Sequence, residues 1–143
     1  MSKVTIEVTL EQARAIRVAL DTYSRLCIGQ LEHVAELCRD CTIPLGGHGG
    51  EQARATAHVE ICEEVDALMR QAKIKLGYSP NGSNGIGHSH VDITGHRAWE
   101  VGKVLAKALA EHRNPKPEFS GVDYDGRIVR YTSDPDAIVR IGA

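Results

Sequence analysis

The chain of 143 residues has few aromatic side chains: one Trp, one Phe and four Tyr make up 4% of it. Its core must therefore be built mainly from Leu, Ile, Val and Ala. It also lacks any apolar run near the roughly 20 residues that cross a bilayer, and its first residues are typical neither of a signal nor of a transit peptide. We expect one domain, residues 1–143, located in the cytoplasm and binding no membrane.

A strong excess of charge of either sign is also missing. The formal net charge of −2 excludes the broad basic surface that holds duplex nucleic acid, so we expect no such partner. A small anion remains a suitable ligand, because a few arginines can grip a diphosphate whatever the net charge. The cysteines come with no secretory context, and we interpret them as buried thiols: Cys27, Cys38, Cys41 and Cys62.

The first third of the chain predicts a strand followed by a long helix. Apolar and polar residues alternate from Val4 to Val8, and TLEQ, which starts at Thr9, is a capping-box pattern. Apolar residues then recur every three or four positions as far as Cys38, which predicts a helix of about 30 residues. At on the order of 45 Å it exceeds the width of a compact chain of this size. It either bends at Gly29 or protrudes, and a protruding apolar helix predicts a homo-oligomer.

Two more helices are predicted downstream. The second runs from about Glu51 to a C-cap at Gly77, and the third from about Thr94 to a stop at Asn114-Pro115.

The last third of the chain predicts a small sheet. Asp125-Gly126 separates two alternating runs, which is typical of a β-hairpin, and residues 137–141 resemble a final strand. We therefore expect an α+β fold: three helices, the first one long, with a short N-terminal strand and a C-terminal antiparallel hairpin or sheet.

Histidines are concentrated in the loop NGIGHSHVDITGH, residues 84–96. His88 and His90, with Asp92 or His96, could supply three metal ligands, which leaves a metal-dependent phosphoesterase as one alternative function. No metal-enzyme signature accompanies them, so we expect neither a metal nor another cofactor. A further alternative is that the loop is only a turn in a structural phage protein.

The CxxC formed by Cys38 and Cys41 could complete a tetrahedral site with His48 and Cys62. The cysteines fall on apolar helix faces, however, where a small buried hydrophobe is the commoner role.

Basic residues on the predicted helices are candidate anion ligands. Arg25 lies close to Gly29 in the predicted helix. A glycine within a helix costs about 1 kcal/mol relative to alanine, so its presence indicates that another group approaches the backbone there. Lys103 and Lys107 share one face of the third helix, and Arg113 lies at its end, where a cation is favoured. For each of them a solvated surface position is the alternative.

Several short motifs resemble the first family of phage Thoeris anti-defence proteins. They are VTLEQA, then YSRLCIGQL at residues 23–31, the Gly85-Ile86 loop, the helix start Ala98-Trp99-Glu100 and the segment LAEHRNP at residues 109–115. The resemblance implies a non-enzymatic sponge, encoded by a phage and active in the cytoplasm of the bacterial host. Such proteins sequester cyclic ADP-ribose isomers made by TIR-domain proteins. Members form dimers that assemble into hexamers and have a separate pocket for cyclic trinucleotides.

The resemblance also assigns parts of the site. It implies that Arg25 contacts phosphate and that Gly85-Ile86 packs on adenine, where Tyr78 or His88 would replace the family's aromatic ring. A family arginine corresponds to Lys103 or Lys107, and lysine lacks the bidentate fork. The full set predicted to bind ligand is Tyr23, Arg25, Gly29, Gln30, Asn84, Gly85, Ile86, His88, Lys103, Lys107 and Arg113.

Overall fold

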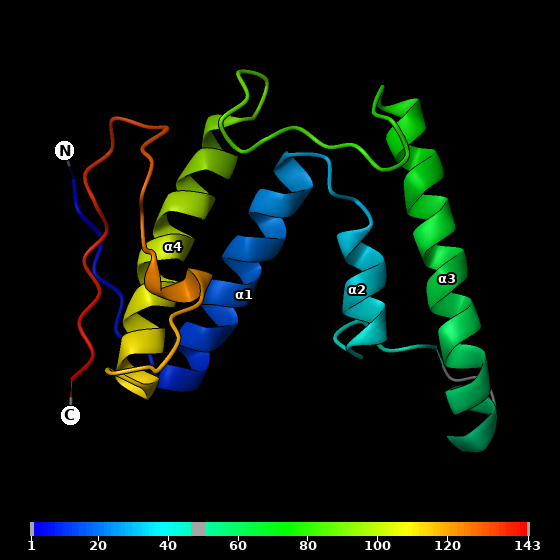
Figure 1. The fold of residues 1–143 in the computed structure, drawn as a ribbon, viewed down its shortest axis with the longest axis horizontal. Coiled ribbons are helices and arrows are strands. Elements are labelled where there is room, and N and C mark those ends of the chain that lie inside the picture. Colours follow the sequence, from blue (N-terminus) through cyan, green and yellow to red (C-terminus); the bar gives the residue numbers. More distant parts are fainter. Residues whose placement is uncertain (1, 47–50, 143) are drawn as a thin grey trace. The chain divides into compact units, whose positions relative to one another are not determined.

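The computed structural model describes residues 2–46 and 51–142, and only the backbone of residues 51–56. Its helices are α1 (Leu10–Cys27), α2 (His33–Arg39), α3 (Glu51–Lys75) and α4 (Ile93–Arg113), followed by the short 3₁₀ helix η1 (Val122–Tyr124) (Figure 1). None of the described helices is long and apolar enough to cross a membrane.

The predicted α+β fold is wrong, because the part of the chain that the structure describes is helical and contains no strand. Contacts divide it into two compact units. The first unit comprises Met1–Ser24 and Ile86–Ala143, and the second unit comprises Arg25–Gly85. The expectation of a single domain stays a prediction.

The start of α1 follows the predicted capping box. The Thr9 amide donates to Oε1 of Gln12 at 2.9 Å, and the Gln12 amide donates to Oγ1 of Thr9 at 3.2 Å. Two amides that the helix leaves unpaired are thereby satisfied.

The predicted long first helix is wrong: α1 ends at Cys27, and α2 begins only at His33. Gly29 adopts a positive φ of 85°, and its amide donates to the Leu26 carbonyl oxygen at 3.0 Å. This left-handed C-cap reverses the chain, so the apolar pattern continues although the helix does not. Helix length therefore no longer supports a homo-oligomer. Gly77 ends α3 in the same way, with a φ of 90°, as predicted.

The predicted hairpin is replaced by a turn and an irregular segment. Gly126 has a φ of 69°, but the residues before it form η1. The Tyr124 hydroxyl donates to the carbonyl oxygens of Ala110 and Asn114 at 3.2 and 2.9 Å, which holds η1 against the end of α4. The predicted strands at residues 4–8 and 137–141 also remain irregular.

Small apolar residues form the core of the first unit. The buried ones on α4 are Ala98, Leu105, Ala106 and Ala110. Helix α1 lies along α4, because a Cβ at Gly102 would be 3.4 Å from Leu20 Cβ. In the second unit α2 packs on α3, and the buried apolar side chains among those described are Ala35, Cys38 and Cys62.

Candidate ligand-binding site

The turn after α1 holds two of the predicted ligand-binding side chains together. Arg25 lies in the last turn of α1, and its Nη1 donates to Oε1 of Gln30 at 3.1 Å. The Gln30 amide in turn donates to the carbonyl oxygen of Arg25 at 3.0 Å. Both residues are half-buried. A guanidinium and an amide oxygen are therefore fixed side by side by the fold of the turn.

The loop after α3 packs on this turn. The Asn84 amide donates to the carbonyl oxygen of Ile28 at 2.9 Å, and its Nδ2 donates to the Tyr78 hydroxyl at 3.3 Å. The Tyr78 ring lies against Gly29, where a Cβ would be 2.5 Å from the ring. Two predicted stretches more than 50 residues apart thus meet within the second unit. We call the following set the Arg25 cluster: Arg25, Gly29, Gln30, Tyr78 and Asn84.

The close approach predicted at Gly29 is made by the chain's own tyrosine. Only glycine suits this position, because its φ is positive and the Tyr78 ring leaves no space for a Cβ. At Gly85, in contrast, a Cβ would meet nothing within 4 Å, so contacts within the chain do not require glycine there. The sequence indicated Tyr78 only as a substitute ring, and the structure places it in the middle of the cluster.

Several predicted residues belong to the first unit instead. The Tyr23 hydroxyl is 2.7 Å from Oγ1 of Thr94, which links α1 to α4. His88 is exposed and lies edge-on to His90, with ring centroids 4.9 Å apart. Ile86 is half-buried.

The basic residues of α4 mainly hold the segment that follows the helix. Nζ of Lys103 donates to the Val122 carbonyl oxygen at 2.8 Å. The side chain of Lys107 lies against Gly126, where a Cβ would be 3.0 Å from Lys107 Cδ. Arg113 is exposed at the last position of α4. The two lysines therefore have structural contacts that the sequence did not indicate.

The histidine loop leads into α4 through a carboxylate cap. Oδ1 of Asp92 accepts a hydrogen bond from the Thr94 amide at 2.8 Å, and the hydroxyl and amide of Thr94 lower the pKa of Asp92. The His96 ring stacks on Tyr131 with centroids 5.4 Å apart. Among the described residues, no three His, Cys, Asp or Glu side chains are placed to hold a metal ion as they stand.

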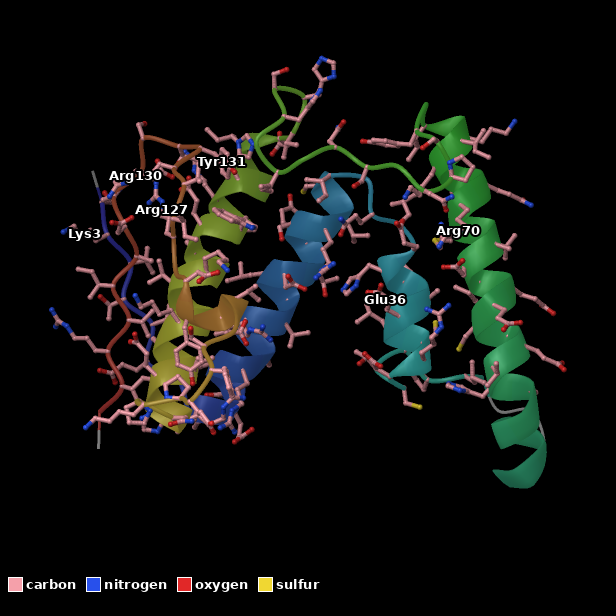
Figure 2. The ribbon with its side chains drawn as sticks, in the orientation of Figure 1. Lys3, Glu36, Arg70, Arg127, Arg130 and Tyr131 are labelled. Atoms are coloured by element: carbon pink, nitrogen blue, oxygen red, sulfur yellow. The ribbon has the colours of Figure 1, made fainter. Side chains whose placement is uncertain are left out.

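Sequence reasoning missed a buried polar network in the first unit. Glu100, 3% exposed, accepts hydrogen bonds from the amides of Tyr131 and Thr132 at 2.6 and 2.9 Å. Its other oxygen accepts from the Thr132 hydroxyl at 2.7 Å and pairs with Nη2 of Arg127 at 3.0 Å. Arg127 and Tyr131 lie on the segment that runs beside α4 (Figure 2).

This network explains the charge state of Glu100. Burial by itself would raise the pKa of the Glu100 carboxyl, but the hydrogen bonds from Tyr131 and Thr132 and the charge of Arg127 outweigh it and lower the pKa. A glutamate within a helix is normally solvated, so no local pattern marks this one as buried.

No family model, curated protein or solved structure matches the chain.

Proposed function

We propose that this protein binds and sequesters cyclic ADP-ribose isomers through the Arg25 cluster, without cleaving them. The observation that supports the proposal is the meeting of the Asn84 loop with the Arg25 turn, through the hydrogen bond from Asn84 to Ile28. These are two of the stretches whose motifs resemble the Thoeris anti-defence family. Their contact is independent of that resemblance.

The chemistry of the cluster suits a nucleotide. The Arg25 guanidinium can donate two parallel hydrogen bonds to phosphate oxygens. The side-chain amides of Gln30 and Asn84 can both donate to and accept from ribose hydroxyls and base edges. The Tyr78 ring is a surface on which a base can stack.

A homo-oligomer is part of this proposal. It is supported by large apolar side chains that the first unit leaves exposed, because association with a second copy would remove apolar area from water. The most exposed, at 70% or more of their area, are Val4, Ile6, Phe119, Val122, Ile128 and Ile138. Light scattering at micromolar concentration is expected to give a dimer or a larger assembly, and a monomer would contradict this part.

The fate of the ligand provides the direct test. The protein is incubated with cyclic ADP-ribose isomers and, separately, with cyclic trinucleotides, then denatured by heat, and the released molecules are separated by chromatography. Intact ligand, bound before heating, is expected. A cleaved product would point to the phosphoesterase instead, and no binding of either class would leave a structural protein.

Arg25 provides the residue-level test. Replacing it by alanine is expected to weaken binding by about 2 to 5 kcal/mol, because ligand phosphate would lose a charge-assisted partner. Arg25→Lys should recover part of the loss, since lysine keeps the charge but not the fork. Arg14→Ala, at an exposed arginine of the same helix, is the matched control. Calorimetric titration in which Arg25→Ala and Arg14→Ala bind equally well would refute the assignment.

A further inference from the structure

Three cysteines and one histidine gather where α2 meets α3. Cys38 lies in the last turn of α2 and Cys41 shortly after the helix ends, while His58 and Cys62 are one turn apart on α3. Nε2 of His58 is 3.8 Å from Sγ of Cys41 and 3.8 Å from Sγ of Cys62. All four residues belong to the second unit.

The order of these residues follows the spacing of zinc-binding modules. Two residues separate Cys38 from Cys41, 16 separate Cys41 from His58, and three separate His58 from Cys62. A close pair of cysteines followed at a distance by a second pair of ligands is the usual arrangement of structural zinc sites. On a helix, a separation of four positions puts His58 and Cys62 on one face. The sequence pattern indicated His48 instead of His58, and His48 lies outside the described residues.

The two distances from Nε2 of His58 to sulfur agree with edges of a tetrahedral site. Zinc binds thiolate sulfur at about 2.3 Å and imidazole nitrogen at about 2.0 Å, so the edge between the two ligand atoms is about 3.6 Å. The distances of 3.8 Å from His58 Nε2 to the two sulfur atoms are close to this edge.

In their present positions the four side chains do not form a complete metal site. Nε2 of His58 is 2.9 Å from the carbonyl oxygen of Cys38, with which it shares a hydrogen bond. Closure therefore requires the imidazole to exchange this carbonyl for a metal ion. It also requires the thiols to lose their protons to solvent, because thiolate is the form that binds zinc.

The apolar core of the second unit is small in the part of the chain that the structure describes. Among its described side chains the buried apolar ones are Ala35, Cys38 and Cys62. A unit the size of Arg25–Gly85 rarely gains enough stability from such a core, and small units commonly add a metal or disulfides. A metal ion here would join the end of α2 to α3.

We propose that Cys38, Cys41, His58 and Cys62 bind one zinc ion, a structural site that ties α2 to α3. The site is independent of the proposed function, because it shares no residue with the Arg25 cluster. It replaces the interpretation of these cysteines as inert buried thiols.

Metal titration of the full chain without a tag tests the site. After removal of metal by a chelator under reducing conditions, the protein is titrated with Co²⁺ and then with Zn²⁺. We expect one ion per chain, sulfur-to-cobalt charge-transfer absorption with the visible bands of tetrahedral cobalt, and displacement of cobalt by zinc. Absence of these bands, together with far less than one zinc per chain after dialysis, would overturn the proposal.

Three variants assign the ligands. Cys62→Ser is expected to lose stoichiometric binding, whereas Cys27→Ser, at a cysteine outside the set, should bind like the wild type. His58→Cys should retain the metal and strengthen the charge-transfer band through an additional thiolate, so the test remains decisive if Cys62→Ser fails to fold. Unchanged cobalt spectra in both Cys62→Ser and His58→Cys would show that any bound metal lies elsewhere and would overturn the assignment.

Discussion

The first unit buries a carboxylate, and the second unit buries an ammonium. Glu100 accepts hydrogen bonds from two backbone amides and pairs with Arg127, whose side chain is 5% exposed. Lys73 is fully buried, and its Nζ donates to Oε2 of Glu32 at 2.7 Å. In both units one buried charge joins segments that are far apart in the sequence.

The two links differ in what they hold. In the first unit the Glu100 carboxylate accepts hydrogen bonds from the amides of Tyr131 and Thr132, which in a sheet a neighbouring strand would accept. In the second unit Lys73 of α3 reaches Glu32, which directly precedes α2, so two regular elements are joined. Removing one partner of a buried pair is costly because the other charge stays buried. The first unit should be the more sensitive, since Glu32 keeps 23% of its side chain in solvent.

Removal of the Glu100 carboxylate should produce the largest effect. Glu100→Ala leaves the amides of Tyr131 and Thr132 without their acceptor and takes one of two carboxylate partners from Arg127, which keeps Asp136. We expect a loss of about 3 to 5 kcal/mol in the stability of the first unit, mainly from the buried donors left unpaired. Trp99, the only tryptophan, lies in this unit, and its fluorescence can follow unfolding by urea. Glu111→Ala, at an exposed glutamate of the same helix, is the control. A loss below about 1 kcal/mol would show that the network is not what holds this segment.

A smaller effect is expected from a methyl group at the turn of the second unit. Gly29→Ala combines left-handed strain of about 1 to 2 kcal/mol with displacement of the Tyr78 ring, for about 2 to 4 kcal/mol in all. Gly77→Ala has a similar positive φ but open space around the Cβ, so it should show the strain alone. The difference between the two variants in thermal unfolding, followed by amide NMR signals of the second unit, isolates the ring contact. Equal losses would contradict it.

Local signals in the sequence predicted those helix ends at which neighbouring residues form the cap. The capping box at Thr9 and the C-cap at Gly77 are confirmed, because their hydrogen bonds connect neighbouring residues. The break after Cys27 was foreseen only as one of two outcomes. Periodicity cannot reveal it, since α1 and α2 both continue the apolar pattern on either side of Gly29.

The hairpin prediction failed for a long-range reason. The amides of Tyr131 and Thr132 have strand-like neighbours in the sequence, but the side chain of Glu100, more than 30 residues away, satisfies them. The arrangement of the Arg25 cluster could be predicted only in part, for the same reason. The sequence and its family resemblance indicated Arg25 and Asn84 separately, whereas the contact that joins their stretches through Ile28 depends on the tertiary fold.

Acid should lower the stability of the two units to different extents, because the first unit lowers the pKa of more carboxyl groups than the second unit does. In the first unit the pKa values of Asp92, Glu100 and Asp134 lie below their ordinary values, the last because Arg97 donates to it. In the second unit burial opposes the shift of Glu32, but its hydrogen bond to Lys73 and that residue's charge lower the pKa.

Acidification should therefore destabilise the first unit more than the second. The effect should be smaller than that of Glu100→Ala or Gly29→Ala, because Asp92 and Asp134 are screened by solvent. A carboxyl with a depressed folded pKa contributes stability that is complete above its unfolded value, 4.5 for Glu100 and 3.8 for the aspartates, and is lost as the pH falls through the folded value. Stability should thus be constant near neutral pH and fall below about pH 4.5.

Urea unfolding at successive pH values measures how steeply the stability of each unit falls with pH. Trp99 fluorescence reports on the first unit, and NMR signals report on the second. In Glu100→Gln, which cannot ionise, the slope of the first unit should become shallower; an unchanged slope would mean that other carboxyls carry the acid sensitivity.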